Sequence, residues 1–260
     1  MRATIAHTFR AEWTKFRTIP SNLSTLLIAV ALMAGLGSLT AYRAGEGYHA
    51  SGASGAFDAT NISMYGGFLF AETVVGALGV LIVTSEYVTG MIRTSLSVVP
   101  RRGRLLAAKA GLFGGIALVA GEVASFAAFL LGQAAIAASG APSATLGQPG
   151  VLRAVTGMGL IWGLVGLVGV ALGCLLRGTM IAVTVLVAVN FLIPIIGPRL
   201  LPKEAGEVLM TYWPISAGLQ VATTVQNPDR LTPWVGLGLM AAFTALLLVM
   251  AFAVFRSRDA

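Results

Sequence analysis

Charged residues are scarce in this sequence: they make up 10% of its 260 residues, against about 25% in ordinary globular chains. Apolar residues account for 57%, and the mean hydropathy is +0.86. A soluble fold could not bury that much apolar surface, so we expect lipid to solvate part of it. The low charge therefore excludes an ordinary soluble domain.

Residue types that carry catalysis and metal binding are also few. The one cysteine, Cys174, lies in an apolar run, which excludes a disulfide within a single chain. The two histidines, His7 and His49, lie outside the apolar runs, which argues against a buried Ser–His dyad. The sequence contains no H-E-x-x-H zinc motif and no G-x-x-x-x-G-K-[ST] phosphate loop. We therefore expect no enzyme activity, metal or cofactor in this chain alone, and any ATP must be used by a separate polypeptide.

Six apolar runs are long enough to cross a bilayer. The first has 20 residues without a charge, and a helix of that length spans about 30 Å of hydrocarbon. The sequence thus predicts an all-α polytopic membrane protein, a single transmembrane domain over residues 1–260. Its six expected transmembrane helices cover residues 23–42, 64–85, 110–138, 154–176, 179–197 and 234–255.

The segments outside these runs are expected to form short helices and connections at the membrane surface. Residues 1–22 form an amphipathic interfacial helix, with Glu12 as an exception inside its apolar arc, expected to pair with Lys15 or Arg17. Residues 86–109 are expected to form a cytoplasmic segment with a short surface helix. Residues 198–233 are interrupted by prolines and are expected to form short outer helices. The apolar arc of the first helix consists of Ile5, Phe9, Trp13, Phe16 and Ile19.

The basic residues are distributed unevenly about the expected spans. The two termini and the second and fourth connections hold 12 of the 17. Since positive residues are retained in the cytoplasm, both termini are expected there, in a multi-pass protein of the plasma membrane. This distribution accounts for the net charge of +7 without a nucleic-acid partner, and membrane lipid is the expected neighbour. The preference for Arg over Lys suggests a bacterial source.

Glycines and acids inside the spans admit two interpretations each. Five glycines of the fourth span fall within roughly one third of the helix circumference, and we favour packing within the chain over a dimer interface. Glu72 and Glu122 lie well inside spans and are possible cavity-facing acids; they serve either a cation or proton pathway, or a hydrogen bond to Ser, Thr or Tyr on a neighbouring helix. The second interpretation is favoured because no span supplies a basic partner. The glycines are Gly159, Gly163, Gly166, Gly169 and Gly173.

Three stretches carry a resemblance to a known family. Residues 12–17, EWTKFR, resemble an E-W-x-K-hydrophobic-R pattern, and residues 85–94, SEYVTGMIRT, resemble an E-Y-x-x-G-x-I-R-x-T signature. Residues 100–104, PRRGR, with Ala108 and Lys109, resemble a basic run that enters a third span. In this order, with six spans, the whole chain resembles the membrane (permease) subunit of type-2 ABC transporters, mostly bacterial exporters.

The resemblance implies a mechanism. The segment after the second span would be a coupling helix that docks into an ATPase subunit, with ATP and Mg bound by that subunit. Two such ATPases would drive alternating access in a pair of six-span subunits, either a homodimer or a pair with a related permease. The implied ATPase-coupling residues are Glu12, Lys15, Glu86, Tyr87, Gly90, Ile92, Arg93, Arg101 and Arg102.

Two other functions remain open from the sequence. One is an ion- or proton-coupled secondary transporter that uses Glu72 and Glu122. The other is a non-transporting membrane anchor or regulator of an ATPase, for example a drug-resistance module. For the exporter, a path lined by glycine and alanine with few charges suggests an amphipathic or hydrophobic substrate, such as a drug, a peptide or a lipid.

Overall fold

A computed structural model describes residues 5–50, 57–92, 94 and 102–257. Within these ranges all regular structure is helical, and six helices are long and apolar enough to cross a membrane. The expectation of an all-α protein with six candidate membrane-spanning helices is therefore confirmed. The coupling helix expected after the second span lies mostly outside the described residues, as do Arg93 and Arg101.

The six long helices extend past the apolar runs that predicted them. They are α2 (Pro20–Ala50), α3 (Ala59–Val88), α5 (Arg102–Ala138), α6 (Val151–Leu176), a helix from Thr179 to Leu200, and α11 (Pro233–Ser257). Residues 86–88 and 102–109, expected in the connecting segment, thus belong to α3 and α5. Hydropathy reports the thickness of the hydrocarbon, whereas a helix continues beyond it as long as its backbone hydrogen bonds are made.

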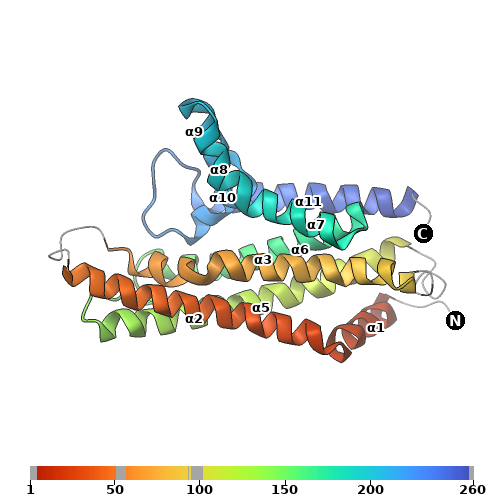
Figure 1. Cartoon of the computed structure of the whole chain (residues 1–260), viewed down its shortest axis with the longest axis horizontal. Coiled ribbons are helices and arrows are strands. Elements are labelled where there is room, and N and C mark those ends of the chain that lie inside the picture. Colours follow the sequence, from red (N-terminus) through yellow and green to blue (C-terminus); the bar gives the residue numbers. More distant parts are fainter. Residues whose placement is uncertain (1–4, 51–56, 93, 95–101, 258–260) are drawn as a thin grey trace.

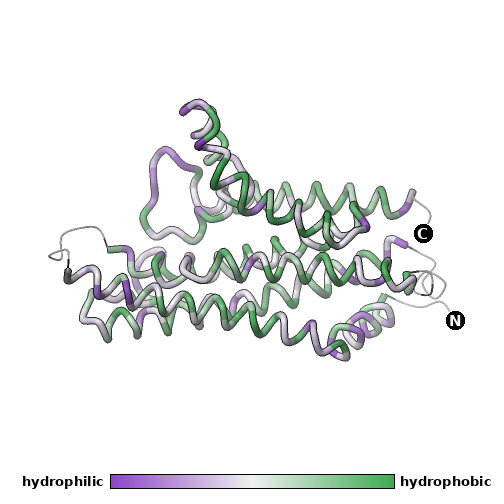
Figure 2. The backbone as a smooth tube through the Cα atoms, in the orientation of Figure 1, coloured by the Kyte–Doolittle hydropathy of each residue, from purple (hydrophilic) through white to green (hydrophobic). Residues whose placement is uncertain are grey.

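Four helices, α2, α3, α5 and α6, form a long bundle (Figure 1). α6 contacts both α3 and α5, and α2 contacts the same two helices. α11 packs on α6, while the short α1 (Ile5–Thr18) lies against α5 at the end of the bundle where both chain termini are found (Figure 1). Hydrophilic residues gather on α1 and in the loop before α11, and apolar residues run along the long helices (Figure 2).

The glycine stripe of α6 is covered by helices of the same chain. Gly159, Gly163 and Gly166 lie against α5, and Gly169 and Gly173 lie against α3. A Cβ atom on Gly173 would lie 2.9 Å from the Val80 carbonyl oxygen, and one on Gly169 would overlap the Gly76 backbone. The stripe is thus occupied by intramolecular contacts, which let the helix backbones approach closely.

The fifth crossing is irregular. α7 (Thr179–Val187) passes into a π-helical turn (Ala188–Leu192) and then into α8 (Ile193–Leu200). α9 (Lys203–Tyr212), α10 (Pro214–Gly218) and a 3₁₀ turn (Leu219–Ala222) follow, and α8 and α9 project from the bundle (Figure 1). Trp213 ties this segment to the π turn, since its indole Nε1 donates to the Val189 carbonyl at 2.7 Å.

Candidate functional site: a buried charge cluster at one end of the bundle

The N-terminal helix presents a face of mixed polarity to the bundle. Thr8, Glu12 and Phe16, spaced four residues apart, are the buried residues of α1. By contrast, most of the apolar arc expected from the sequence is exposed: Trp13, for example, has 46% of its surface exposed. That arc is available to lipid, and Glu12 interrupts it because it lies toward the neighbouring helices.

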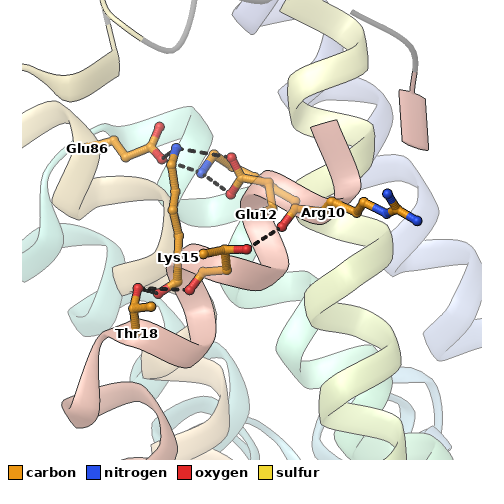
Figure 3. Close-up of polar contacts among 7 residues, drawn as sticks. Arg10, Glu12, Lys15, Thr18 and Glu86 are labelled. Carbon is orange, nitrogen blue, oxygen red and sulfur yellow. Dashed lines mark hydrogen bonds and ion pairs between the residues drawn. The ribbon is translucent and has the colours of Figure 1, made fainter. Parts of the chain in front are cut away.

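Glu12, Lys15, Glu86 and Lys109 come together as one group, which we call the charge cluster (Figure 3). Lys109 Nζ donates to Glu12 Oε2 at 2.7 Å and to Glu86 Oε1 at 2.6 Å. Lys15 Nζ donates to Glu86 Oε1 at 2.8 Å and to Glu12 Oε1 at 3.2 Å. Each lysine therefore bridges both carboxylates, and the four charges sum to zero.

Three helices supply the members of the charge cluster. α1 carries Glu12 and Lys15, the last turn of α3 carries Glu86, and the start of α5 carries Lys109. Lys109 is 4% exposed, and Glu12 and Glu86 are 5% exposed each, whereas the Lys15 side chain is 33% exposed. Lys109 is thus the inner cation, and Lys15 closes the group on the solvent side.

Burial by itself would lower the pKa of Lys15, which lies at the edge of the cluster. Its hydrogen bond to Glu86 and the charges of Glu12 and Glu86 act in the opposite direction, and together they raise its pKa above the ordinary value. Lys15 therefore remains charged throughout the physiological pH range and continues to balance the carboxylates.

The charge cluster ties α1 to the ends of two membrane-spanning helices. A buried ion that loses its partner costs about 3–5 kcal/mol, so the helices separate here only if several charges separate together. A cavity of about 260 Å³ adjoins the cluster, and its wall includes all four charged residues and apolar side chains such as Phe16 and Leu81. One carboxylate oxygen, Glu86 Oε2, is buried without a hydrogen-bond partner in the described part of the chain.

Glu86 was expected to open the cytoplasmic segment and to belong to the coupling interface. The structure places it in the last turn of α3, where it is buried and where Lys15 and Lys109 supply its counter-charges. The sequence did suggest the Glu12–Lys15 pair, but Lys109 was seen only as part of a basic run.

The other residues of the expected coupling interface lie around the end of α3. Gly90 has a φ of 71°, the left-handed conformation that glycine adopts without strain, and it changes the direction of the chain after α3. The ring of Tyr87 lies under the Arg177 guanidinium, 5.3 Å from its carbon to the ring centroid, so Tyr87 contacts the turn after α6. Ile92 is buried at 5% exposure, and Arg102 is the first residue of α5.

The two acids inside the spans differ from each other. Glu122 is partly exposed, and its carboxyl lies over Gly159 of α6. Glu72 has no exposed surface, and neither of its carboxyl oxygens has a hydrogen-bond partner among the described residues. The expected hydrogen bond from Glu72 to a Ser, Thr or Tyr is therefore not found there.

These features define the chain as a polytopic helical membrane protein with a neutral, buried ion cluster at one end of its bundle. No family model and no curated protein matches the sequence.

Proposed function

We propose that the chain is the transmembrane permease subunit of an ATP-driven exporter, with energy supplied by a separate ATPase. The charge cluster carries this proposal. It joins the N-terminal helix to the ends of α3 and α5, so that a force applied to α1 reaches two membrane-spanning helices through ion pairs of 2.6–3.2 Å. Buried ion pairs suit this task because partial separation is costly.

In this proposal the charge cluster faces the cytoplasm, where most basic residues are expected. The segment after Gly90 and the exposed polar residues of α1, such as Arg10 and Arg17, meet the ATPase. Its closure on ATP moves α1 together with the ends of α3 and α5, which closes the inner side of the path and opens the outer side. The resemblance to type-2 ABC permeases supports this assignment through the same residues, Glu12, Lys15 and Glu86.

The test begins with the partner. The tagged chain, extracted in a mild detergent, should co-purify with a stoichiometric ATPase that contains a phosphate-binding loop. Co-reconstituted in proteoliposomes, the pair should export a fluorescent amphiphile only when ATP is supplied. If the purified chain moves the dye uphill alone, or if ATP has no effect on flux, the proposal fails.

Glu86→Gln tests the role of the cluster. It keeps the size of the side chain but removes the charge that both lysines share, so ATP hydrolysis should continue while ATP-driven flux falls. Glu46→Gln is the matched control, since Glu46 is exposed on α2. If the two variants insert into the membrane and bind the ATPase equally well and also show equal ATP-driven flux, the charge cluster is not required for coupling.

A second candidate function is proton-coupled transport without an ATPase, because Glu72 is buried in the membrane domain without a partner. Proteoliposomes that contain only this chain distinguish the two. A pH gradient alone should then drive uphill flux, and Glu72→Gln should abolish it.

A further inference from the structure

A second cavity lies away from the charge cluster, between α3 and the irregular segment that follows α7. Its volume is about 490 Å³. Four residues of its wall, Tyr65, Phe68, Leu69 and Glu72, occur at steps of three, one and three along α3 and so share one face of that helix. We call this space the Glu72 cavity.

Three buried polar atoms of the Glu72 cavity wall lack partners among the described residues. They are the two carboxyl oxygens of Glu72 and the side-chain nitrogen of Asn190. Glu72 is 0% exposed and Asn190 is 7% exposed. Most buried polar groups in folded proteins are hydrogen-bonded, so acceptors and a donor left over in one wall mark a place where a bound group can supply both kinds of partner.

The backbone around Asn190 is also unusual. Asn190 lies on the π-helical turn, Ala188–Leu192, and the described chain is α-helical on both sides of it. Single π turns inside helices occur frequently at functional sites. Here the turn places an amide in the same wall as the carboxyl of another helix.

The rest of the wall is mostly apolar and aromatic near α3. The rings of Tyr65 and Phe68 lie 6.1 Å apart and are tilted by 52°. The Tyr65 hydroxyl donates to the Leu219 carbonyl at 3.2 Å, which fixes the ring at the cavity. The second charged residue of the wall, Arg230, donates to Thr211 at 3.3 Å and lies in the loop before α11.

We propose that the Glu72 cavity binds an organic cation, namely a protonated amine on an apolar body. Its ammonium group donates to Glu72, a polar substituent accepts from Asn190, and its body contacts the rings of Tyr65 and Phe68. Aromatic faces attract cations, and a carboxylate in an apolar wall becomes stable when a cation pairs with it. The site requires no ATPase and goes beyond the proposed coupling function.

A proton alone satisfies the observations less well. It would neutralise Glu72 but would add a hydroxyl donor that needs an acceptor of its own. It would also leave the side-chain nitrogen of Asn190 without a partner among the described residues. Because Glu72 itself has no accessible surface, its carboxyl reaches a ligand when neighbouring side chains of the wall move aside.

Dansylcadaverine is a suitable probe because it joins a primary amine to an environment-sensitive aromatic group. Its N-acetyl derivative is the matched neutral analogue. The full chain in phosphatidylcholine nanodiscs is titrated with each compound at neutral pH, and the signal of empty nanodiscs is subtracted. We expect saturable, blue-shifted fluorescence with the amine, and affinity at least about tenfold weaker for the acetylated compound, because a charge-assisted hydrogen bond is lost.

Variants locate the site. Glu72→Gln should weaken binding of the amine by at least about tenfold, and Asn190→Ala should weaken it less, since only a neutral hydrogen bond is removed. Glu122→Gln, which changes the other acid inside the spans, is the control and should bind as the unmodified chain does. Size-exclusion chromatography verifies that each variant is folded.

Three results would overturn the proposal: equal affinity for the amine and its acetylated form, unchanged binding in folded Glu72→Gln, or no saturable signal. If Glu72→Gln does not fold, the comparison of the two compounds on the unmodified chain still decides. No ATPase is present in this assay, so its outcome is separate from that of the coupling experiments.

Discussion

Lys109 is the most deeply placed cation of the charge cluster, and it bonds to both carboxylates. Its replacement by methionine leaves Glu12 and Glu86 buried with one cation between them. We expect Lys109→Met to lower the free energy of unfolding by about 3–5 kcal/mol, the usual cost when a buried ion pair loses one partner.

Lys15→Met is the matched comparison, because Lys15 bonds to the same carboxylates but is 33% exposed at its side chain. Solvent weakens its contribution, so its loss should cost clearly less. Denaturation with sodium dodecyl sulfate in mixed micelles measures both. Equal losses would contradict the assignment of Lys109 as the inner cation.

The raised pKa of Lys15 gives a second prediction at the residue scale. A cation whose folded pKa lies above its ordinary value of 10.5 contributes fully below that value, and the contribution is lost as the pH rises through the folded pKa. The difference in stability between the unmodified chain and Lys15→Met should therefore be constant from about pH 6 to 9 and shrink only above 10.5. A difference that changes near neutral pH would contradict this.

Single residues of the cluster were only partly predictable. Glu12 stood out as an acid in an apolar arc, and Lys15, one turn away, was a natural partner. Lys109 is 97 positions from Glu12, and no local pattern links them. Glu72 was recognised as costly to bury, but the cavity around it depends on the packing of a distant segment, so its lack of a partner could not be read from sequence.

At the scale of helices, α6 depends on close contact through glycine. A methyl group on Gly169 would overlap the backbone of Gly76 in α3, and backbone cannot move aside as a flexible side chain can. We expect Gly169→Ala to destabilise the protein by about 1–3 kcal/mol, the usual cost of overpacking. Thermal unfolding in detergent measures the loss.

Gly115→Ala in α5 is the control for this prediction. A Cβ atom at Gly115 meets nothing within 4 Å, so the substitution should be neutral or slightly stabilising, since alanine favours helix over glycine. If both substitutions change the stability by the same amount, Gly169 is not needed for the close packing of α6 on α3.

The six long helices were predictable, but their ends were not. Long apolar runs located every crossing, because the hydrocarbon thickness sets their length. α5 nevertheless begins at Arg102, where the sequence suggested a polar connection. Its early basic residues are compatible with helix, and Lys109 is neutralised by acids from other elements. The π turn in the fifth crossing has no comparable sequence signal.

At the scale of the molecule, the arrangement of charge predicts an orientation. An even number of crossings puts both termini on one side, and the basic residues favour the cytoplasm. A cysteine introduced at Asn227, exposed in the loop before α11, should react with a membrane-impermeant maleimide in intact cells. One at Ser257, exposed at the end of α11, should react only after permeabilisation.

The native Cys174 is buried and gives the background for these measurements. The unmodified chain should therefore remain unlabelled in both conditions. If Ser257→Cys is labelled in intact cells and Asn227→Cys is not, the predicted orientation is wrong. The proposed side of ATPase contact is then wrong as well.

The junction between α1 and α2 has a mechanical consequence. One residue, Ile19, separates the two helices, and proline at the start of α2 fixes the chain direction there. α1 is therefore held at two places, by this short connection to α2 and by the ion pairs of Glu12 and Lys15. In the proposed coupling, a displacement of α1 would pull on α3 and α5 through those ion pairs rather than be taken up by a flexible linker.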